Sequence, residues 1–371
     1  MINGHGGNIY ALAASLGCEP SDIIDMSSNV NPIGPPPGLI DCLKAHLDTI
    51  TALPEVDAEG AVAAFAIRHG IDPDRVLAGN GTTQFIYTLP RALSARKALI
   101  LGPTYADYAD ACHLNQVPCD FILADDSRDL IHDADAISSS IGDADLVFIC
   151  NPNNPTGTLI PAPDLEQLCR SHPDTRFVID ESYLPFVKKP EMHSMIHSPF
   201  SNAIILNSMS KIFRLPGLRI GFLIARPEII STLAPYALPW SANSLAQDAV
   251  RYLMAQTGSI DAFICNTRQL IEAEKQMFLD TFQNVSGIHF FPSVTSFLLA
   301  RLSGSFTAED VCTALARHKL LIRNCSNFRG LTNRYIRISM KTPEINRMAA
   351  ERLMALLKSK QHTEGNKAAH Q

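Results

Sequence analysis

The stretch AIILNSMSKIFRLPGLRIG, residues 203–221, decides the fold class of this chain. Its first four residues are all apolar, which predicts a strand covered on both faces in a mostly parallel sheet. The strand leads into a polar turn with Ser208 and Ser210 just before Lys211, and Arg219 follows eight residues later. A lysine at a strand end is usually a solvated charge. Here, however, hydroxyls and a guanidinium suited to a phosphate accompany an amine that can form an imine with an aldehyde.

Other short apolar runs surround this strand. Between about residues 75 and 225 they alternate with helical patterns and occupy residues 97–101, 119–123, 145–150, 176–180 and 219–225. Strands joined by helices in this way predict an α/β domain, in which ligands gather at the carboxyl ends of the parallel strands.

The pattern changes after residue 240. Helices are expected near residues 307–318 and 343–359, and strands near residues 289–301, 320–325 and 334–339. Mixed elements of this kind predict a smaller α+β lobe. The expected division is an N-terminal arm, a large domain, a small C-terminal domain and a disordered polar tail, at residues 1–38, 39–245, 246–358 and 359–371.

The composition favours a globular protein that acts on small molecules. Hydrophobic residues make up 46% of the 371 residues and charged residues 18%, and the formal net charge of −6 offers no basic face for nucleic acid. The nine cysteines form no CxxC pair, which favours a reducing cytoplasm over a disulfide framework or a zinc site. The sequence shows neither a signal peptide nor an apolar run of about 18 residues. We therefore expect a cytoplasmic protein without metal, membrane or nucleic-acid partners.

Two more polar segments follow predicted strands. Asp180 ends one strand and Tyr183 comes three residues later, although such an aspartate is more commonly a helix N-cap. The strand at 145–150 is followed by NPNNPTG, which contains Asn154 and resembles an ordinary turn when taken alone. Because parallel strands end at the same edge of a sheet, we expect these side chains to meet Lys211 in one crevice.

Two weaker segments fit the same crevice. In GNGTT, the amides and hydroxyls of Gly81, Thr82 and Thr83 precede a helical stretch from about Gln84 and could bind a phosphate at a helix N-terminus. In GPTY, Tyr105 could lay its ring on a flat ligand, and packing in the core is its equally plausible alternative.

Pyridoxal 5'-phosphate suits this set of groups. Its aldehyde can form an imine with Lys211, and its phosphate needs the hydroxyl, amide and guanidinium donors described above. A carboxylate such as Asp180 facing the pyridine nitrogen holds a proton there, which lets the ring accept electrons from an attached α-carbon. Tyr183 could then reach the phenolic oxygen of the ring.

With these residues together, the chain resembles the fold type I pyridoxal-phosphate enzymes of the aspartate aminotransferase superfamily, over residues 1 to about 358. The motifs occur in order as Gly-Asn-Gly, Pro-Thr-Tyr, Asn-Pro-Thr-Gly, Asp-Glu-x-Tyr, and Ser-x-Ser-Lys with Gly-Leu-Arg-x-Gly. The resemblance implies catalytic roles for Lys211, Asp180 and Tyr183. It also implies cofactor contacts for a further set, comprising Gly81, Thr82, Thr83, Tyr105, Asn154, Ser208, Ser210 and Arg219.

Within the superfamily the chain is similar to two groups of enzymes, the threonine-phosphate decarboxylases of cobalamin biosynthesis and the histidinol-phosphate aminotransferases. The decarboxylases are favoured by four stretches, HGGN at 5–8, SNVNPIGP at 28–35, PWSAN at 239–243 and LIRNC at 321–325. This resemblance implies a homodimer with active sites at the interface. It also implies that the substrate's phosphate and carboxylate are bound by His5, Asn29, Asn154, Arg323 and Arg337.

The expected function is therefore decarboxylation of a small O-phospho amino acid, either threonine phosphate or serine phosphate. Transamination of histidinol phosphate is the alternative. A binding module that keeps the fold without the chemistry is disfavoured, because Lys211 and Asp180 are both present. The chain departs from the family at Leu53, where a tyrosine commonly reaches across the dimer to the cofactor phosphate, and at Gln84, where an acidic residue is common.

Overall fold

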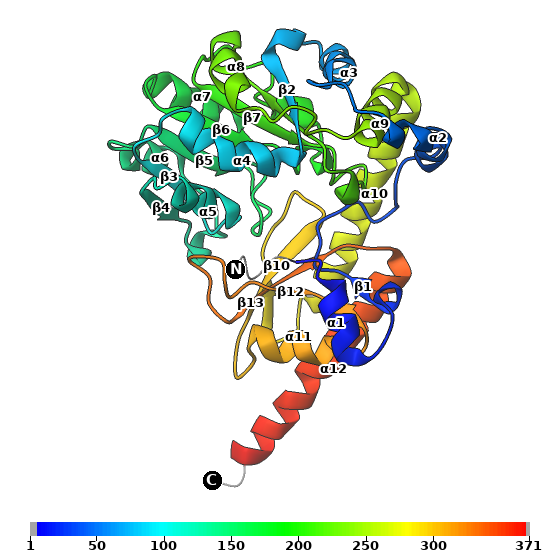
Figure 1. Cartoon of the computed structure of the whole chain (residues 1–371). Coiled ribbons are helices and arrows are strands. Elements are labelled where there is room, and N and C mark those ends of the chain that lie inside the picture. Colours follow the sequence, from blue (N-terminus) through cyan, green and yellow to red (C-terminus); the bar gives the residue numbers. More distant parts are fainter. Residues whose placement is uncertain (1–5, 369–371) are drawn as a thin grey trace.

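The computed structural model describes residues 6–368, with side chains described through residue 359, and it has two lobes (Figure 1). A seven-stranded sheet forms the centre of the large lobe. From edge to edge its strands are β2 (Val76–Gly79), β8 (Gly221–Ile224), β7 (Ala203–Ser208), β6 (Arg176–Asp180), β5 (Leu146–Cys150), β3 (Ala98–Gly102) and β4 (Cys119–Leu123). The strands from β7 to β4 run parallel, and β8 is antiparallel to both of its neighbours. Every residue of β3 and β5 is buried, as expected for strands covered on both faces. The predicted mostly parallel α/β sheet is confirmed.

Helices connect and cover these strands. They are α2 (Leu39–Ala45), α3 (Glu59–His69), α4 (Gly81–Ala92), α5 (Asp107–Leu114), α6 (Ala134–Ser140), α7 (Ala162–Ser171), α8 (Pro227–Leu233) and α9 (Ser244–Ala255). Three of the crossovers between successive parallel strands are formed by α5, α6 and α7, and the crossover from β6 to β7 contains only short 3-10 turns. Since α4 begins at Gly81 rather than near Gln84, the Gly-Thr-Thr part of this segment forms the first helical turn, and Asn80 is the N-cap residue.

The small lobe is built on a four-stranded antiparallel sheet. Its strands are, in order, β12 (Arg323–Asn324), β13 (Tyr335–Ser339), β10 (Phe297–Leu302) and β9 (Ile288–Phe290), and its helices are α11 (Ala308–Ala316) and α12 (Pro343–Ala368). The predicted smaller α+β lobe is confirmed.

The N-terminal segment joins this small lobe. After α1 (Ile9–Leu16), strand β1 (Ile24–Asp25) pairs in parallel with β11 (Leu320–Leu321), and Met26 is buried in the small-lobe core. The segment predicted as an arm therefore supplies a strand and a core residue to the opposite end of the chain.

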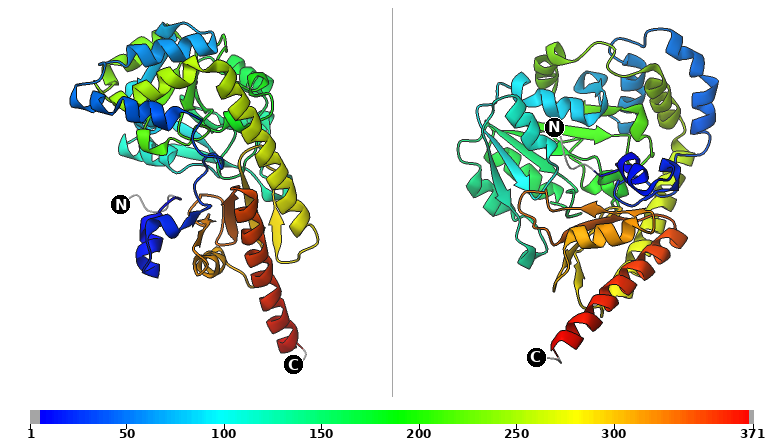
Figure 2. Two further views of the ribbon diagram at one scale, coloured as in Figure 1. Left: turned by 90° about the vertical axis from the view of Figure 1, so that its right-hand side faces the viewer. Right: turned by 60° about the horizontal axis from the view of Figure 1, so that its bottom comes forward.

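One long helix, α10 (Thr257–Phe282), belongs to both lobes. Ile260, Phe263 and Ile271 are buried in the large-lobe core, whereas Phe278 and Phe282 are buried in the small-lobe core. Figure 2 shows this helix, in yellow, passing from one lobe to the other. It therefore fixes the two lobes on either side of the space where the site lies.

The C-terminal tail differs from the expectation. A disordered polar segment was predicted for residues 359–371, but α12 continues through Ala368. No proline interrupts the segment, and its lysine, glutamine and alanine residues are good helix formers. Within the described part of the chain, no helix is long and apolar enough to cross a membrane, and no cluster of metal-ligating side chains is present.

Candidate active site

The polar segments after β5, β6 and β7 meet at one edge of the sheet, because these three strands are adjacent and parallel. They enclose a cavity of about 80 Å³. Every residue predicted to contact the cofactor lines it, namely Gly81, Thr82, Thr83, Tyr105, Asn154, Asp180, Tyr183, Ser208, Ser210, Lys211 and Arg219. The structure thus brings together groups from five separate segments of the large lobe.

One end of this cavity is suited to a phosphate. The amides of the first turn of α4 point toward it, and the Asn80 side chain does not cap the helix. Gly81 has a φ of +71°, and a Cβ there would lie 2.7 Å from Nη2 of Arg219. Arg219 donates one hydrogen bond, to the Pro216 carbonyl, and forms no ion pair with any described residue. Uncapped amides and an unpaired guanidinium are the donors that a phosphate dianion needs.

Asp180 lies deep in the cavity and is 5% exposed. Its carboxylate accepts hydrogen bonds from the Tyr108 hydroxyl and from the Ser182 amide, both at 2.9 Å. Burial raises the pKa of Asp180, whereas the bonds from Ser182 and Tyr108 and the charge of Lys211 oppose that rise. A buried carboxylate held in this way suits a protonated pyridine nitrogen.

Lys211 lines the cavity together with Asp180 and Tyr183. Its Nζ lies 5.9 Å from the centre of the Tyr183 ring and forms no hydrogen bond with another described residue. Burial lowers the pKa of Lys211, an effect that Arg219 and Arg337 reinforce and Asp180 opposes. A lowered pKa increases the fraction of neutral amine, which is the form that attacks an aldehyde. These residues together fit pyridoxal 5'-phosphate.

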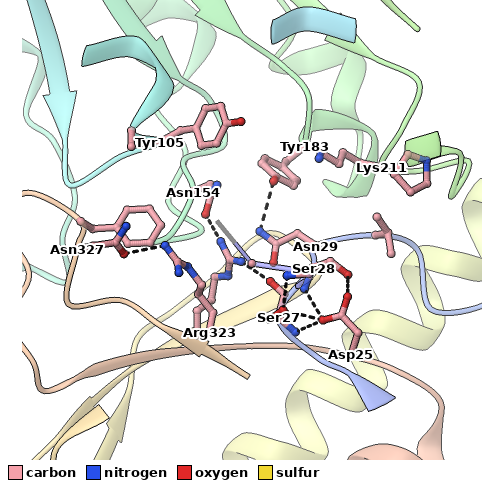
Figure 3. Close-up of a pocket in the computed structure, with 17 residues that line it drawn as sticks. Asp25, Ser27, Ser28, Asn29, Tyr105, Asn154, Tyr183, Lys211, Arg323 and Asn327 are labelled. Carbon is pink, nitrogen blue, oxygen red and sulfur yellow. Dashed lines mark hydrogen bonds between the residues drawn. The ribbon is translucent and has the colours of Figure 1, made fainter. Parts of the chain in front are cut away.

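A second cavity, of about 390 Å³, adjoins the first and shares Tyr105, Asn154, Tyr183 and Lys211 with it (Figure 3). The predicted substrate residues Asn29, Arg323 and Arg337 line it. His5 lies outside the described residues, although its neighbours Gly6 and Gly7 also line this cavity.

Arg323 and Arg337 face this cavity side by side, because β12 and β13 place them opposite each other in register. Arg337 is 4% exposed and donates to the Asn154 side chain and to the Ser27 carbonyl at 2.6 Å. Its Nε is buried and has no acceptor in the described structure. Arg323 donates to the Asn327 side chain at 2.7 Å. Neither arginine forms an ion pair with a described residue, so the cavity presents two cations that an anionic ligand can neutralise.

Asn29 connects the two cavities. Its amide nitrogen donates to the Tyr183 hydroxyl at 3.3 Å, and its oxygen accepts from the Ser339 hydroxyl at 2.7 Å. Burial raises the pKa of Tyr183 to about 12, so its hydroxyl keeps its proton at neutral pH and can donate to a ring oxygen.

Two features of the site were not predicted from the sequence. Tyr108 is 1% exposed and stacks on Phe148 with ring centres 5.1 Å apart, and its position three residues after Tyr105 was the available signal. Asp25, Ser27 and Ser28 also line the larger cavity, and an aspartate two residues before a pair of serines is an Asx-turn pattern. At the two departures from the family, Leu53 is 75% exposed, and the Gln84 side chain accepts a hydrogen bond from the Asn80 amide at 2.7 Å.

Comparisons with known proteins agree with this site. The model of the family Aminotransferase class I and II matches residues 21–353. The chain is 31% identical over 366 residues to the threonine-phosphate decarboxylase of Salmonella typhimurium, with 96% of each chain covered. It is 30% identical over 348 residues to the adenosylcobalamin biosynthesis bifunctional protein CobDQ of Leptospira interrogans; this covers 92% of the chain but only 40% of that longer protein.

Two solved structures share the fold. One is L-threonine-O-3-phosphate decarboxylase from Porphyromonas gingivalis, with a TM-score of 0.81, 28% identity, and coverage of 90% of this chain and 99% of that one. The other is histidinol-phosphate aminotransferase from Clostridium acetobutylicum, with a TM-score of 0.83, 26% identity, and the same coverage of both chains. The expected fold type and cofactor are thereby confirmed. The chain belongs to the class I and II aminotransferase family of pyridoxal-phosphate-dependent enzymes.

Proposed function

We propose that this chain is a pyridoxal-phosphate-dependent decarboxylase of an O-phospho amino acid, threonine O-3-phosphate or serine O-phosphate, and that it forms an amino-alcohol phosphate for cobalamin biosynthesis. The observation that carries the proposal is the pair Arg323 and Arg337, which face one cavity beside Lys211 without a carboxylate partner among the described residues. A substrate with both a carboxylate and a phosphate supplies an anion for each arginine. The decarboxylase and CobDQ relatives support the same assignment.

The chain's own residues divide the work of the reaction. Bound pyridoxal phosphate supplies an electron sink for negative charge at the α-carbon of an attached amino acid. Lys211 would hold the cofactor, and its Nζ would be the group that donates a proton to the α-carbon. Asp180 keeps the proton on the pyridine nitrogen. The two arginines would hold the substrate's anions, and in this way they would fix the orientation of the bonds at the α-carbon.

Transamination of histidinol phosphate is the second candidate, favoured by the solved aminotransferase that shares the fold. Histidinol phosphate carries a phosphate but no carboxylate, so in its own half of the transamination it leaves one arginine without an anion. The two candidates therefore differ in how completely the substrate neutralises the cavity.

The test is to incubate the purified, cofactor-loaded protein with each phospho-amino acid, and separately with histidinol phosphate plus 2-oxoglutarate. We expect carbon dioxide from a phospho-amino acid without any keto acid, and none from the Lys211→Ala variant, which lacks the imine-forming amine. Glutamate formation without carbon dioxide would instead establish the aminotransferase.

We also propose that the protein is a cytoplasmic homodimer. All nine cysteines are free, which suits a reducing compartment. The apolar side chains of Leu53, Val56, Leu238 and Trp240 are exposed, and the Trp240 amide donates to the Val56 carbonyl at 3.0 Å, which brings their two segments together in one region. Contact with a second copy would remove this region from water.

A further inference from the structure

The carboxylate of Asp25 organises a tight turn at the edge of the larger cavity. It accepts hydrogen bonds from the Ser27 amide at 2.8 Å, the Ser27 hydroxyl at 2.7 Å, the Ser28 amide at 3.1 Å and the Ser28 hydroxyl (Figure 3). Burial opposes ionisation of Asp25, but the bonds from Ser28 and Ser27 outweigh that effect and hold its pKa below the usual value. Four donors around one carboxylate fix the orientation of the whole turn.

The carbonyl groups of this turn accept hydrogen bonds from two cationic side chains. The Ser27 carbonyl accepts from Nη2 of Arg337 at 2.6 Å, and the Ser28 carbonyl accepts from Nζ of Lys341 at 3.4 Å. Because Arg337 has no ion-pair partner among the described residues, the Ser27 carbonyl is one of the two acceptors that set its direction. A shift of the turn would therefore move the guanidinium.

The same turn binds the segment that follows His5. The Ser27 hydroxyl, which donates to Asp25, accepts a hydrogen bond from the Gly7 amide at 2.6 Å. A Cβ on Gly6 would lie 2.7 Å from the Ser27 carbonyl oxygen, and Gly7 has a φ of +83°. Both positions therefore require glycine, one for close approach and the other for its backbone conformation. Gly6 and Gly7 line the same cavity as the two arginines.

We propose that Asp25 is a positioning residue for substrate binding, because through Ser27 it both seats the Gly6–Gly7 segment as a wall of the cavity and orients Arg337. The choice of substrate for the test rests on the proposed function. Asparagine replaces the carboxylate only in part. Its amide nitrogen cannot accept the bond that the Ser28 hydroxyl donates to Oδ2, and the three bonds to Oδ1 lose the negative charge that strengthens them.

The test compares Asp25→Asn with Asp125→Asn. Asp125 is a matched control because it accepts from the Ser127 amide at 2.9 Å in a similar turn that lines neither cavity. We expect Asp25→Asn to raise KM for the phospho-amino acid about tenfold or more, with kcat changed less than about threefold. Affinity for pyridoxal phosphate and the absorbance of the bound cofactor should not change. Amide hydrogen exchange in the N-terminal peptide that contains Gly7 should become faster. Asp125→Asn should match the unmodified protein in every measurement.

Gly6→Ala provides an independent variant, since it displaces the segment and leaves the Asp25 turn intact. We expect a similar rise in KM, and the effect of the double variant with Asp25→Asn should be smaller than the sum of the two single effects, because both changes disturb the contact between the Gly6–Gly7 segment and Ser27. Unchanged exchange of the N-terminal peptide in Asp25→Asn would overturn the proposal whichever reaction the enzyme performs. A loss of affinity for pyridoxal phosphate in Asp25→Asn that is as large as its loss of affinity for the substrate would also overturn the proposal. If no substrate releases carbon dioxide, the proposed function fails while the exchange result still decides the role of Asp25.

Discussion

At the scale of single residues, Tyr108 is the group that most directly supports Asp180. Its hydroxyl donates to the carboxylate while its ring stacks on Phe148. Tyr108→Phe keeps the ring and removes the donor. Since hydrogen bonds to a charged group contribute about 1.5 to 3 kcal/mol, we expect kcat to fall about tenfold and affinity for pyridoxal phosphate to weaken several-fold, as measured by cofactor absorbance titration.

Tyr87→Phe is the matched control for this prediction. The Tyr87 hydroxyl is buried without a hydrogen-bond partner in the described structure, and it lines neither cavity of the site. Its removal should leave both kcat and cofactor affinity unchanged. Equal effects of the two substitutions would show that Tyr108 acts only through packing.

At the scale of elements, the contact between β8 and the start of α4 shapes the phosphate end of the cofactor cavity. A Cβ on Gly221 would lie 2.6 Å from the Thr82 amide nitrogen, a backbone atom that cannot move away cheaply. We expect Gly221→Ala to push the first turn of α4 out of place, which should lower affinity for pyridoxal phosphate at least about tenfold and destabilise the fold by about 1 to 3 kcal/mol.

The control is Gly217→Ala, in the loop before β8, where a Cβ would have no neighbour within 4 Å. Cofactor titration and thermal unfolding of both variants, with and without cofactor, make the comparison. If Gly221→Ala and Gly217→Ala lower the affinity for pyridoxal phosphate equally, the close approach at Gly221 is not what positions the first turn of α4.

The sequence predicted the features of the structure that are determined by local sequence pattern. Several strands of the large sheet are almost entirely apolar, and the polar segments that follow three of them fall at one edge, so the convergence of Asn154, Asp180 and Lys211 followed from local pattern. The role of Tyr108 depends on which face of α5 meets β6, and that face is set by packing rather than by local pattern. The Asp25 turn likewise depends on pairing between β1 and β11, which no short window of sequence contains.

At the scale of the whole molecule, Glu181 links stability to pH. It is 1% exposed, and its carboxylate accepts from the Met195 amide at 2.6 Å and the Ser194 hydroxyl at 2.7 Å. Burial raises the pKa of Glu181 from 4.5 to about 7, with a further contribution from the charge of Asp180. The folded protein therefore binds this proton more tightly than the unfolded chain. The resulting stability is fully present below about pH 4.5 and is lost as the pH rises through about 7.

Glu181→Gln should flatten this dependence, because glutamine stays neutral and keeps an acceptor oxygen for the Met195 amide. We expect the variant to gain stability over the unmodified protein at about pH 8 and to show little difference at about pH 4.5, as read from unfolding midpoints in denaturant. Glu228→Gln, at the exposed start of α8, is the control and should show no such change. The prediction would be contradicted if the unfolding midpoints of Glu181→Gln and the unmodified protein differed by the same amount at both pH values.

The pairing of Ile24 with Leu320 also means that β1 can join its sheet only late in the synthesis of the chain. The two partners are separated by about 300 residues, which a ribosome adding about 5 to 20 residues per second takes roughly 15 to 60 s to traverse. During that interval the nascent chain completes every strand of the large sheet, and with them the cofactor cavity. It still lacks Arg323 and Arg337, and β1 has no strand to pair with. The residues that line the cofactor cavity are therefore all synthesised before the two arginines of the larger cavity and before the strand that pairs with β1.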